Sequence, residues 1–507
     1  AAEVAEIYNN GSGDIGQPKL AITSPSTFSG STNKSISYQA SSKTAYGVTG
    51  HDSTVFYELL NVPSGLSLNM TSNTTGTVTG TASTAGTYNF QVKASNDHNW
   101  SAVKDVSLTI SDYSAWNYAL PFTTDYSDSS PLEDWNMLVR FSEDNSTGLG
   151  ASGFRYSQAR SNGSDLRFID KHGAELKYEI ANWNTTGESQ VWVRVPYLKS
   201  DSNITAFWGN SNAGLPGYAN DGSVWDGYFG VYHLEENTGN AVDSSPYGND
   251  LPGVNSPVVV ASGMSGKSFS VTQAANNGFL SNSITGNIKA KEGTYIAWIQ
   301  NNPSATADVN KDFWGIGYNN DSTHFGKMEF GTTGKDHARF RVSGGTTGFG
   351  GFSSTNISLN GGWKMLTLVI KDGYATTYVD TSTDTSSLWY HPGLDSITGL
   401  SIGRGIDDAG PSTTFDEATF STVARSAAWI SASYENQKPS STYLNFGSLV
   451  GPISLDDPDY TEIFGKKDTT ITSYTVAHSG NGSFTATGLP PGLTINSATG
   501  EISGSTS

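Results

Sequence analysis

The strongest constraint on the fold is a motif that occurs twice, once near each end of the chain. Residues Val62–Gly80 read VPSGLSLNMTSNTTGTVTG, and residues Gly488–Gly504 read GLPPGLTINSATGEISG. Both contain Pro, then Gly-Leu, an alternating pair of Ser/Thr and apolar residues, Asn, and a closing Thr-Gly-x-apolar-x-Gly. Gly492 lies 427 residues after Gly65. A fixed separation between similar segments is typical of chains built from repeated structural units.

A second pair of segments has nearly the same separation. Residues Ala1–Asn10, AAEVAEIYNN, align without gaps on Ala427–Asn436, AAWISASYEN, at an offset of 426 residues. We therefore interpret the chain as a little more than one period of an array of long, multidomain repeats. In this interpretation residues 1–16 are the C-terminal tail of a preceding repeat, and residues 451–507 begin the next one.

The composition favours an all-β protein. A length of 507 residues predicts roughly three or four domains at about 150 residues each. The 57 Gly residues, together with Asn, Asp and Ser, separate short alternating segments, which is typical of all-β folds. Aromatic residues make up 11% of the chain, enough to build hydrophobic cores, so the polar composition does not indicate disorder.

The net charge and the absence of Cys restrict the classes of function. A net charge of −19 argues against binding to nucleic acid or to anionic membranes, because phosphates are bound by clustered Lys and Arg. Without Cys, zinc-thiolate sites, iron–sulfur clusters and cysteine catalysis are excluded. No apolar run is long enough to span a bilayer, so we expect no membrane-spanning segment.

Residues 17–112 are predicted to form a small β-sandwich, with strands at Tyr88–Ser95 and Val106–Ile110. The motif Pro-x-Gly-Leu followed by Thr-Gly-x-Val-Thr-Gly-Thr resembles the immunoglobulin/cadherin-like (Ig-like) domains of bacterial surface proteins, which are usually spacers. Residues 451–507 are predicted to be a partial second copy that reaches the equivalent of Ser83. The sequence leaves open whether another chain completes the sheet edges of this copy.

Residues 113–225 are predicted to be a further β unit. Residues Val191–Val195, VWVRV, alternate between Val and other side chains, which predicts a strand with two different faces. A string of segments in this unit resembles an uncharacterised domain family of bacterial and archaeal secreted proteins. The segments are Leu138–Phe141, Gly163–Phe168, Tyr178–Ile180, Val191–Pro196 and Ile204–Asn210. That family typically precedes a laminin-G-like jelly roll and implies no established activity.

Residues 226–450 are predicted to contain buried strands at Tyr295–Gln300 and Trp363–Ile370, and the sequence KDGY at Lys371–Tyr374 predicts a hairpin. The resemblance to laminin-G-like, concanavalin-A-like jelly rolls is carried by Gly230–Glu236, by the Asp-Ser-Ser and Gly-Asn-Asp runs that follow it, and by FDEATF at 415–420. Residues 426–434 are predicted to be the short closing helix. The resemblance implies that residues 1–16 end such a jelly roll in the preceding repeat.

The laminin-G-like resemblance also implies one structural Ca²⁺ between the Asp-Ser-Ser loop and the Asp-Glu strand. Hard cations require several oxygen ligands, which carboxylates, Asn and backbone carbonyls supply. The candidate ligands are Asp243, Asn249 and Asp416, and the secondary candidates are Asp250 and Glu417. The alternative is that Asp243 makes a turn hydrogen bond and Asp416 a surface ion pair.

Two aromatic residues are candidates for sugar contacts, because sugar rings present both C–H faces and hydroxyl groups. Trp314 lies in the run KDFWGIGY, and Trp389 lies in a predicted loop. The alternative, which is more common in jelly rolls, is that aromatic side chains pack in the core. Trp298, in a predicted strand, is assigned to the core.

Asp165, Arg167 and Glu179 form the most suggestive polar group of the 113–225 unit. Asp165 and Arg167 lie two residues apart, so they share one face of a strand. They could form a carboxylate pair with an arginine clamp, but an ion-pair network that stabilises the sheet is the favoured interpretation.

Motifs of catalysis are absent. The chain has no Gly-x-Ser-x-Gly and no His-Glu-x-x-His. The glycoside hydrolases of the laminarinase type carry Glu-x-Asp-x-x-Glu, whereas Asp416-Glu417 is followed by Ala-Thr-Phe, so a retaining carboxylate pair is not supported. His233 lies in a strand-like run and is predicted to be structural.

The sequence therefore predicts an all-β chain in which Ig-like sandwiches flank a β domain and a jelly roll. The favoured function is a non-enzymatic, structural and adhesive segment of a large secreted or cell-surface repeat protein of a prokaryote, in which repetition turns weak contacts into avidity. The predicted partners are a polysaccharide or cell-surface molecule and further copies of the repeat. The alternatives are a calcium-dependent glycan-binding lectin module and an accessory region of a polysaccharide-degrading enzyme.

Overall fold

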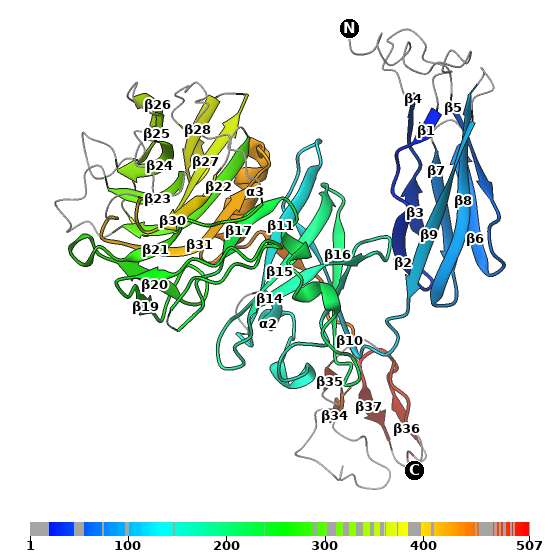
Figure 1. Ribbon diagram of the computed structural model, residues 1–507. Helices are drawn as coiled ribbons and strands as arrows, with labels where there is room; N and C mark the ends of the chain where they lie inside the picture. Colours follow the sequence, from blue (N-terminus) through cyan, green and yellow to red (C-terminus); the bar gives the residue numbers. More distant parts are fainter. Residues whose placement is uncertain are drawn as a thin grey trace, which may run out of the picture. The chain divides into compact units, whose positions relative to one another are not determined.

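Figure 1 shows the computed structural model of the chain. The structure describes residues 20–44, 55–72, 76–96, 101–144, 148–237, 239–286, 292–301, 311–317, 324–330, 338–344, 349–354, 359, 361–372, 374–383, 397–406, 410–451, 454–455, 470, 474–475, 478–479, 483–486, 489 and 492–505. The described residues are almost all in strands and turns, which confirms the all-β prediction. They divide into two compact units, one comprising residues up to 117 with 167–176 and 203–207, and the other comprising the rest.

The first unit contains a small β-sandwich, as the sequence predicts. One sheet has the order β2 (Thr27–Ser31), β9 (Ser101–Ser111), β8 (Gly86–Asn96) and β5 (Val55–Leu60), with β2 parallel to β9; the other has the order β3 (Ile36–Gln39), β7 (Thr77–Ala82) and β6 (Leu66–Ser72). The remaining strands pair as β1 (Leu20–Ile22) with β4 (Ser42–Thr44), and β12 (Arg167–Ile169) with β13 (Glu175–Leu176) and with β16 (Asn203–Trp208). Alternate residues of both sheets fill one core, which includes Ile36, Val78, Phe90 and Leu108.

The repeated motif forms a hairpin in which its last glycine has a steric role. In β6 and β7, Gly80 lies opposite Leu68, and a Cβ added at Gly80 would lie 1.7 Å from the carbonyl oxygen of Ser67. In the second copy, Gly504 lies opposite Leu493, and an added Cβ would lie 2.1 Å from the carbonyl oxygen of Gly492. The closing Gly recurs because both strands approach too closely for a side chain.

The second copy has the corresponding strands among its described residues. Strand β37 (Glu501–Gly504) lies between β34 (Tyr474–Thr475) and β36 (Leu493–Ile495), and β33 (Ser454–Leu455) pairs with β35 (His478–Ser479). Residues 1–16, the predicted tail of a preceding jelly roll, lie outside the described residues.

The second unit begins with a small, twisted β structure. Strand β15 (Ser189–Leu198) lies between β11 (Leu132–Phe141) and β14 (Tyr178–Asn182), and short helices α2 (Gly148–Ala151), η1 (Tyr156–Gln158), η2 (Gly217–Ala219) and η3 (Ser223–Trp225) connect the strands. Both faces of β15 are covered: Val191 and Val193 are fully buried, and Trp192 on the other face is 2% exposed. The alternation predicted two different faces, but a second layer of side chains buries the Trp192 face as well.

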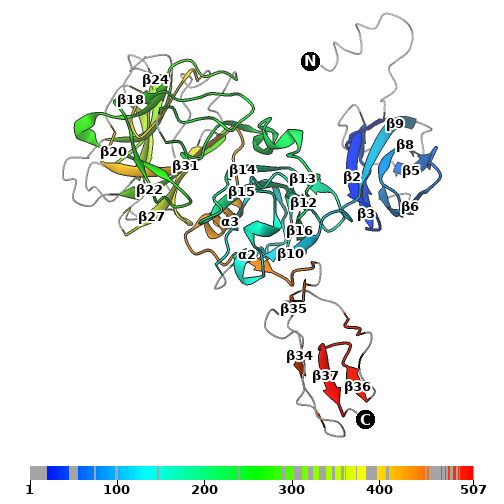
Figure 2. The same ribbon diagram turned by 90° about the horizontal axis from the view of Figure 1, so that it is seen from below.

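The following residues form a sandwich of two antiparallel sheets, which lie face to face (Figures 1 and 2). One sheet has the order β19 (Val258–Val260), β20 (Ser268–Val271), β31 (Thr413–Ser421), β22 (Gly293–Asn301), β27 (Trp363–Lys371), β28 (Tyr374–Val379) and β29 (Ser382–Thr383), with β17 (Tyr228–Tyr232) also pairing with β31. The other has the order β18 (Gly253–Val254), β21 (Gly278–Ser281), β30 (Gly399–Ile402), β23 (Asp312–Gly317), β24 (His324–Phe330), β25 (Ala338–Gly344) and β26 (Phe349–Ser354). A single-turn helix, η4 (Gln273–Ala275), precedes β21.

Local predictions in the sandwich are confirmed. The predicted buried strands are the central parts of β22 and β27. Lys371 pairs with Tyr374 across a two-residue turn, and Asp372 has φ 51°, as a tight hairpin requires. The predicted closing helix is α3 (Ala427–Gln437), whose N-cap residue Ser426 accepts a hydrogen bond from the Trp429 N–H.

The last strand of the predicted jelly roll pairs with the small β structure that precedes it in the sequence. Strand β32 (Leu444–Phe446), which the sequence assigned to the jelly roll of residues 226–450, pairs with β10 (Tyr118–Thr124). Helix α3 packs on β11, not only on the sandwich. The two predicted domains therefore share one structural unit. None of the helices among the described residues is long and apolar enough to cross a lipid bilayer.

The substitution Gly80→Ala is expected to lower the free energy of unfolding of the first unit by about 1–3 kcal/mol, because the new methyl group must displace a backbone carbonyl. Chemical denaturation of the full chain measures the change. Gly214→Ala is the control, since a Cβ added there meets no atom within 4 Å. Equal unfolding free energies for the two variants would contradict the steric role of Gly80.

Candidate functional site

Helix α3 presents three polar side chains along one face. Ser433, Asn436 and Gln437 have the i, i+3, i+4 spacing of one helix surface and are 0%, 1% and 7% exposed. Buried polar groups require hydrogen-bond partners. Ser433 and Asn436 find their partners on β11, and Gln437 finds its partner on β22. We call this arrangement the α3 junction.

Two tryptophans attach the helix to the sheets on its two sides. The Trp135 indole N–H, from β11, donates to Ser433 Oγ at 3.0 Å. The Trp298 indole N–H, from β22 of the sandwich, donates to Gln437 Oε1 at 2.9 Å. The Trp298 ring also stacks on Tyr434, with 5.8 Å between ring centroids. One helix thus fixes the small β structure to the sandwich through buried, directional bonds.

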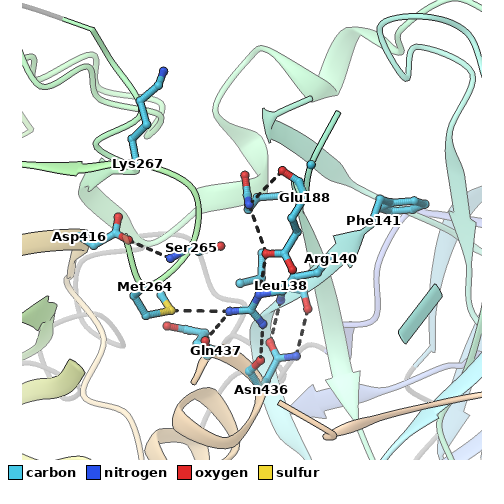
Figure 3. Close-up of polar contacts among 12 residues, drawn as sticks. Leu138, Arg140, Phe141, Glu188, Met264, Ser265, Lys267, Asp416, Asn436 and Gln437 are labelled. Atoms are coloured by element: carbon cyan, nitrogen blue, oxygen red, sulfur yellow. Dashed lines mark hydrogen bonds and ion pairs between the residues drawn. The ribbon is translucent and has the colours of Figure 1, made fainter. Parts of the chain in front are cut away.

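Asn436 acts as a replacement for a neighbouring strand. Its Oδ1 accepts from the Leu138 backbone N–H at 2.7 Å, and its Nδ2 donates to the Leu138 carbonyl at 3.0 Å (Figure 3). Strand β11 is at the edge of its three-stranded sheet, so these backbone groups have no strand partner on that side. The side-chain amide satisfies both, which is the requirement for a buried sheet edge.

Arg140 completes the junction from the same strand. Figure 3 shows its guanidinium directed toward the end of α3, where it donates to the carbonyl oxygens of Asn436 and Gln437. These are two of the carbonyls that a helix C-terminus leaves without an intrahelical partner. Arg140 Nε also lies 3.2 Å from Glu188 Oε1. Burial lowers the pKa of Arg140, and the nearby carboxylates, Glu188 first, partly offset that effect.

A buried histidine lies between two carboxylates close to this junction. His233 Nδ1 is 2.7 Å from Glu417 Oε2, and His233 Nε2 is 3.6 Å from Glu179 Oε2. The imidazole stacks on Trp192, with 5.8 Å between ring centroids. Burial alone would lower the pKa of His233, but the carboxylates of Glu417 and Glu179 outweigh it and hold the pKa well above its usual value. The histidine therefore acts as a buried cation.

Glu179 connects the small β structure to the loop after β17. Its Oε1 accepts from Ser244 Oγ at 2.6 Å, and its Oε2 accepts from the Trp225 indole N–H. Burial alone would raise the pKa of Glu179, but the bonds from His233, Ser244 and Trp225 lower it below its usual value. Glu179 is therefore the ionised partner of His233.

Asp416 and Glu417 point into the protein from a bulge in β31. The pairing of β31 with β22 shifts register between Ile296 and Trp298. The backbone of Glu417 has a φ of 44°, which is rare for a residue other than glycine. Asp416 accepts from the Ser265 N–H at 3.0 Å and from the Glu417 N–H. Burial, and then the repulsion of Glu417, raises the pKa of Asp416 well above its usual value, and burial also raises that of Glu417.

The carboxyl groups of Asp416 and Glu417 lie in closely packed surroundings. Asp416 has no exposed surface, and Glu417 is 2% exposed. The cavity beside Glu417 has a volume of about 10 Å³ and is walled by tryptophans that include Trp192 and Trp225. A space of this size holds at most about one water molecule. The strongly shifted groups of this region therefore stabilise a packed interface between elements.

The candidate calcium ligands Asp243 and Asn249 lie in one loop, but their oxygens are occupied. Asp243 Oδ1 accepts from the N–H groups of Val231 and Ser245, and Oδ2 accepts from Ser245 Oγ and the Asn249 N–H. Asn249 Oδ1 accepts from the N–H and the hydroxyl of Thr285. These bonds use the acceptor positions that a cation would need. As folded, the two side chains fit the hydrogen-bonded turn and do not present free oxygens to Ca²⁺.

Asp416, the third candidate ligand, accepts hydrogen bonds from the N–H groups of Ser265 and Glu417, as described above. It is fully buried, so it does not form the surface ion pair that was the alternative prediction. Asp250 Oδ1 accepts from the Asp243 N–H, and Glu417 pairs with His233. Among the residues that the structure describes, no three His, Asp or Glu side chains are grouped so that they could hold a metal ion. Calcium binding stays a prediction that needs its own experiment.

The predicted sugar contacts differ in outcome. Trp314 lies on β23 with no exposed surface and packs edge-on against Tyr295 and Phe420, with centroid distances of 5.5 Å and 5.8 Å. A sugar cannot reach this ring, so the core alternative describes Trp314, and the same is true of Trp298. Trp389 lies outside the described residues.

The polar group of Asp165, Arg167 and Glu179 serves the sheets. Asp165 is fully buried and accepts from the N–H groups of Arg160, Gly209 and Asn210. Arg167 Nε lies 3.6 Å from Glu175 Oε1. Glu179 has the partners given above. Structural stabilisation, the favoured interpretation, agrees with these contacts.

Sequence reasoning did not identify the α3 junction. Asn436 is one of many asparagines, and its partner Leu138 is an ordinary strand residue 298 positions away. One pattern could have indicated it: Ser433, Asn436 and Gln437 form a polar stripe beside the apolar Trp429 and Ile430 on a helix that is otherwise suited to burial.

Two sequence families match parts of the chain. Residues 19–111 and 452–507 match the family described as Putative Ig domain, and residues 162–247 match the one described as Domain of unknown function (DUF2341). The first match at both ends confirms the internal repeat of an Ig-like domain. The second match runs beyond residue 225, where the sequence analysis placed a boundary, and includes the loop that contains Asp243.

Several solved structures resemble the chain distantly. Domain 4 of AbnA, a GH43 extracellular arabinanase from Geobacillus stearothermophilus, is 13% identical with a TM-score of 0.32, and the match covers 40% of this chain and 96% of that one. The binding domain of botulinum neurotoxin serotype D is 13% identical with a TM-score of 0.34, over 42% and 52% of the two chains. A sialidase from Trypanosoma rangeli is 11% identical with a TM-score of 0.31, over 82% and 84%. Likenesses at these scores carry no argument about function.

No curated protein matches the chain. The family descriptions name an Ig-like fold and a domain without a known role. Functional inference therefore depends on the geometry of this chain.

The substitution His233→Gln is expected to lower the free energy of unfolding by about 3–5 kcal/mol, because it leaves Glu179 and Glu417 buried without their cation. Since the folded-state pKa of His233 is raised, its contribution to stability is complete below pH 6.5, the usual His value, and is lost as the pH rises through the raised pKa. The wild-type unfolding free energy should therefore decline at alkaline pH, and the decline should be smaller in the variant.

Urea denaturation of the full chain at a series of pH values above 7 measures this effect. The range starts at pH 7 because burial raises the pKa of Glu235 to about 7. Ionisation of Glu235 therefore makes the unfolding free energy fall as the pH rises from the usual Glu pKa to about 7. His172→Gln, in the other compact unit, is the control and is expected to change stability by less than about 0.5 kcal/mol. An alkaline decline of equal size in His233→Gln and in the unmodified chain would contradict the assignment.

The substitution Asp243→Asn is expected to lower the Tm in buffer that contains EDTA, because an amide nitrogen cannot accept the two bonds now made to Oδ2, a loss of about 1–3 kcal/mol. Differential scanning calorimetry in EDTA and in calcium chloride measures it. A calcium-dependent rise in Tm that Asp243→Asn abolishes would support the calcium prediction. Equal Tm values of the unmodified chain in both buffers would contradict that prediction.

Proposed function

We propose that this chain is a non-enzymatic, structural segment of an extracellular repeat protein, in which the small β structure and the sandwich act as one rigid piece between Ig-like spacers. The observation that carries the proposal is the α3 junction, where Ser433, Asn436 and Gln437 bind β11 and β22 with almost no exposed surface. Consecutive domains joined by a flexible linker do not need buried hydrogen bonds of this kind.

The tandem arrangement supports the proposed role as a stalk or fibre. The same Ig-like family matches residues 19–111 and 452–507, on either side of the rigid piece. An alternation of spacer and rigid piece extends a chain away from its attachment point and repeats any binding surface along its length. The resemblance of these modules to those of bacterial surface proteins suggests a secreted or cell-surface protein of a prokaryote.

A non-catalytic role is supported by the placement of the titratable groups. Asp416, Glu417 and His233 have strongly shifted pKa values, which often mark active sites. Here His233 pairs with Glu417, Asp416 accepts from backbone N–H groups, and the cavity beside Glu417 is too small for a substrate. The alternative role, an accessory region of a polysaccharide-degrading enzyme, would place catalysis in another part of the same protein.

Mechanical unfolding of the full chain tests the rigid piece. We expect the residues of the second unit between 118 and 451 to unfold in one step, whose length corresponds to about 3.3–3.6 Å per released residue. Asn436→Leu leaves the Leu138 N–H and carbonyl unpaired, at about 1–3 kcal/mol for each group. This variant should unfold in two steps, with the small β structure separating from the sandwich.

Asn445→Leu is the matched control, because this asparagine is exposed on β32. The hydrogen bond described for its side chain is donated to Asp125 Oδ1 at the surface. This variant should retain the single step. Two separate steps in the unmodified chain would show that the sandwich and the small β structure are independent, and would contradict the proposed function.

A further inference from the structure

A polar pocket of about 390 Å³ lies between two loops of the second unit. Residues 218–222, after β16, form one wall, residues 243–248 form the other, and Glu179 and Val224 complete the lining. The volume is within the range of about 300–1,000 Å³ that small-molecule sites occupy. The residues of the α3 junction do not line this space; of the buried histidine site, Glu179 does.

The two loops meet in a way that fixes the shape of the pocket. Gly222 has φ 76°, and a Cβ added there would lie 2.6 Å from the nitrogen of Pro246. Only a glycine permits this contact of backbone with backbone. The opposite loop is held by the four hydrogen bonds that Asp243 accepts. The pocket is therefore preformed, so ligand binding does not require the entropy loss of ordering its loops.

Each loop contributes one tyrosine. Tyr218 packs edge-on against Tyr178, with 5.8 Å between ring centroids and an angle of 82° between the rings, which fixes its orientation. Tyr247 is 44% exposed, among the large hydrophobic side chains left most open to solvent in the described residues. An exposed tyrosine offers an apolar face and a polar hydroxyl at a low cost in conformational entropy. The C–H face and the hydroxyls of a sugar ring match these two properties.

The polar groups of the pocket favour a neutral ligand that is rich in hydroxyls. Ser223, whose backbone N–H donates to Asp221 Oδ1 at 2.8 Å, lowers the pKa of Asp221, so its exposed carboxylate is ionised at neutral pH. Glu179 is ionised as well, as its lowered pKa indicates. The Asp221 carboxylate accepts hydrogen bonds from hydroxyl groups and repels anionic ligands. The Glu179 oxygens already accept from Ser244 and Trp225. Asn220, beside Asp221, offers both a donor and an acceptor.

We infer that this pocket binds one or two residues of a neutral polysaccharide, with Tyr247 stacking on a sugar ring and Asp221 accepting from its hydroxyl groups. The inference gives the proposed structural segment a ligand, but its residues are separate from those of the α3 junction. Loss of sugar binding would leave the single-step unfolding unchanged, and the two proposals fail independently.

Titration calorimetry of the full chain with xylotriose, maltotriose and mannotriose tests the inference, and trigalacturonic acid serves as the anionic probe. At least one neutral trisaccharide should bind, and trigalacturonic acid should not. Tyr247→Ala should weaken the binding at least tenfold, which is about 1.4 kcal/mol. Asp221→Asn should also weaken it, because the variant accepts fewer hydrogen bonds from hydroxyl groups.

Tyr374→Ala is the matched control, since Tyr374 is 60% exposed on β28 and is not part of the pocket. Its affinity should equal that of the unmodified chain, and circular dichroism should show the same fold for every variant. The inference would be overturned if none of the neutral trisaccharides bound the folded chain. It would also be overturned if trigalacturonic acid bound more tightly, or if Tyr247→Ala and Asp221→Asn left the affinity unchanged.

Discussion

The edge of strand β11 is the constraint on which the second unit depends. An edge strand presents a row of peptide groups that must be paired or kept in water. At Leu138 a side-chain amide, that of Asn436, takes the place of a neighbouring strand, and Arg140 uses the same edge to bind the end of the helix that carries Asn436. Pairing of this edge and docking of helix α3 are thus the same event, so the small β structure and the sandwich acquire a fixed relation.

The buried charges beside this edge act chiefly on specificity. Removing charges from water is costly, and an ion pair in the interior often stabilises a protein no more than apolar residues of equal size. The line of Glu179, His233 and Glu417 has a definite register, however, because only one alignment of the elements places the imidazole between both carboxylates. An apolar interface between the same elements could slide; this one cannot without leaving a charge unpaired.

Features determined by neighbours in the sequence could be predicted, and those determined by distant residues could not. The repeated Gly80, the turn at Asp372 and the N-cap Ser426 depend on local backbone geometry, which a short motif encodes. The role of Asn436 depends on an edge 298 residues away, and nothing in the flanking residues specifies it. Trp314 shows the same limit in reverse, since an aromatic residue in a Gly-rich run can be core or surface until the opposite sheet is known.

The pairing of β10 with β32 has a consequence for biosynthesis. Phe122 lies opposite Phe446, which the ribosome reaches 446 − 122 = 324 residues later. At about 5–20 residues per second, the edge of β10 that pairs with β32 stays unpaired for about 15–65 s. During that interval the nascent chain exposes this edge, which includes Phe122. During synthesis, the exposed edge of β10 must therefore be kept from pairing with other strands until β32 emerges.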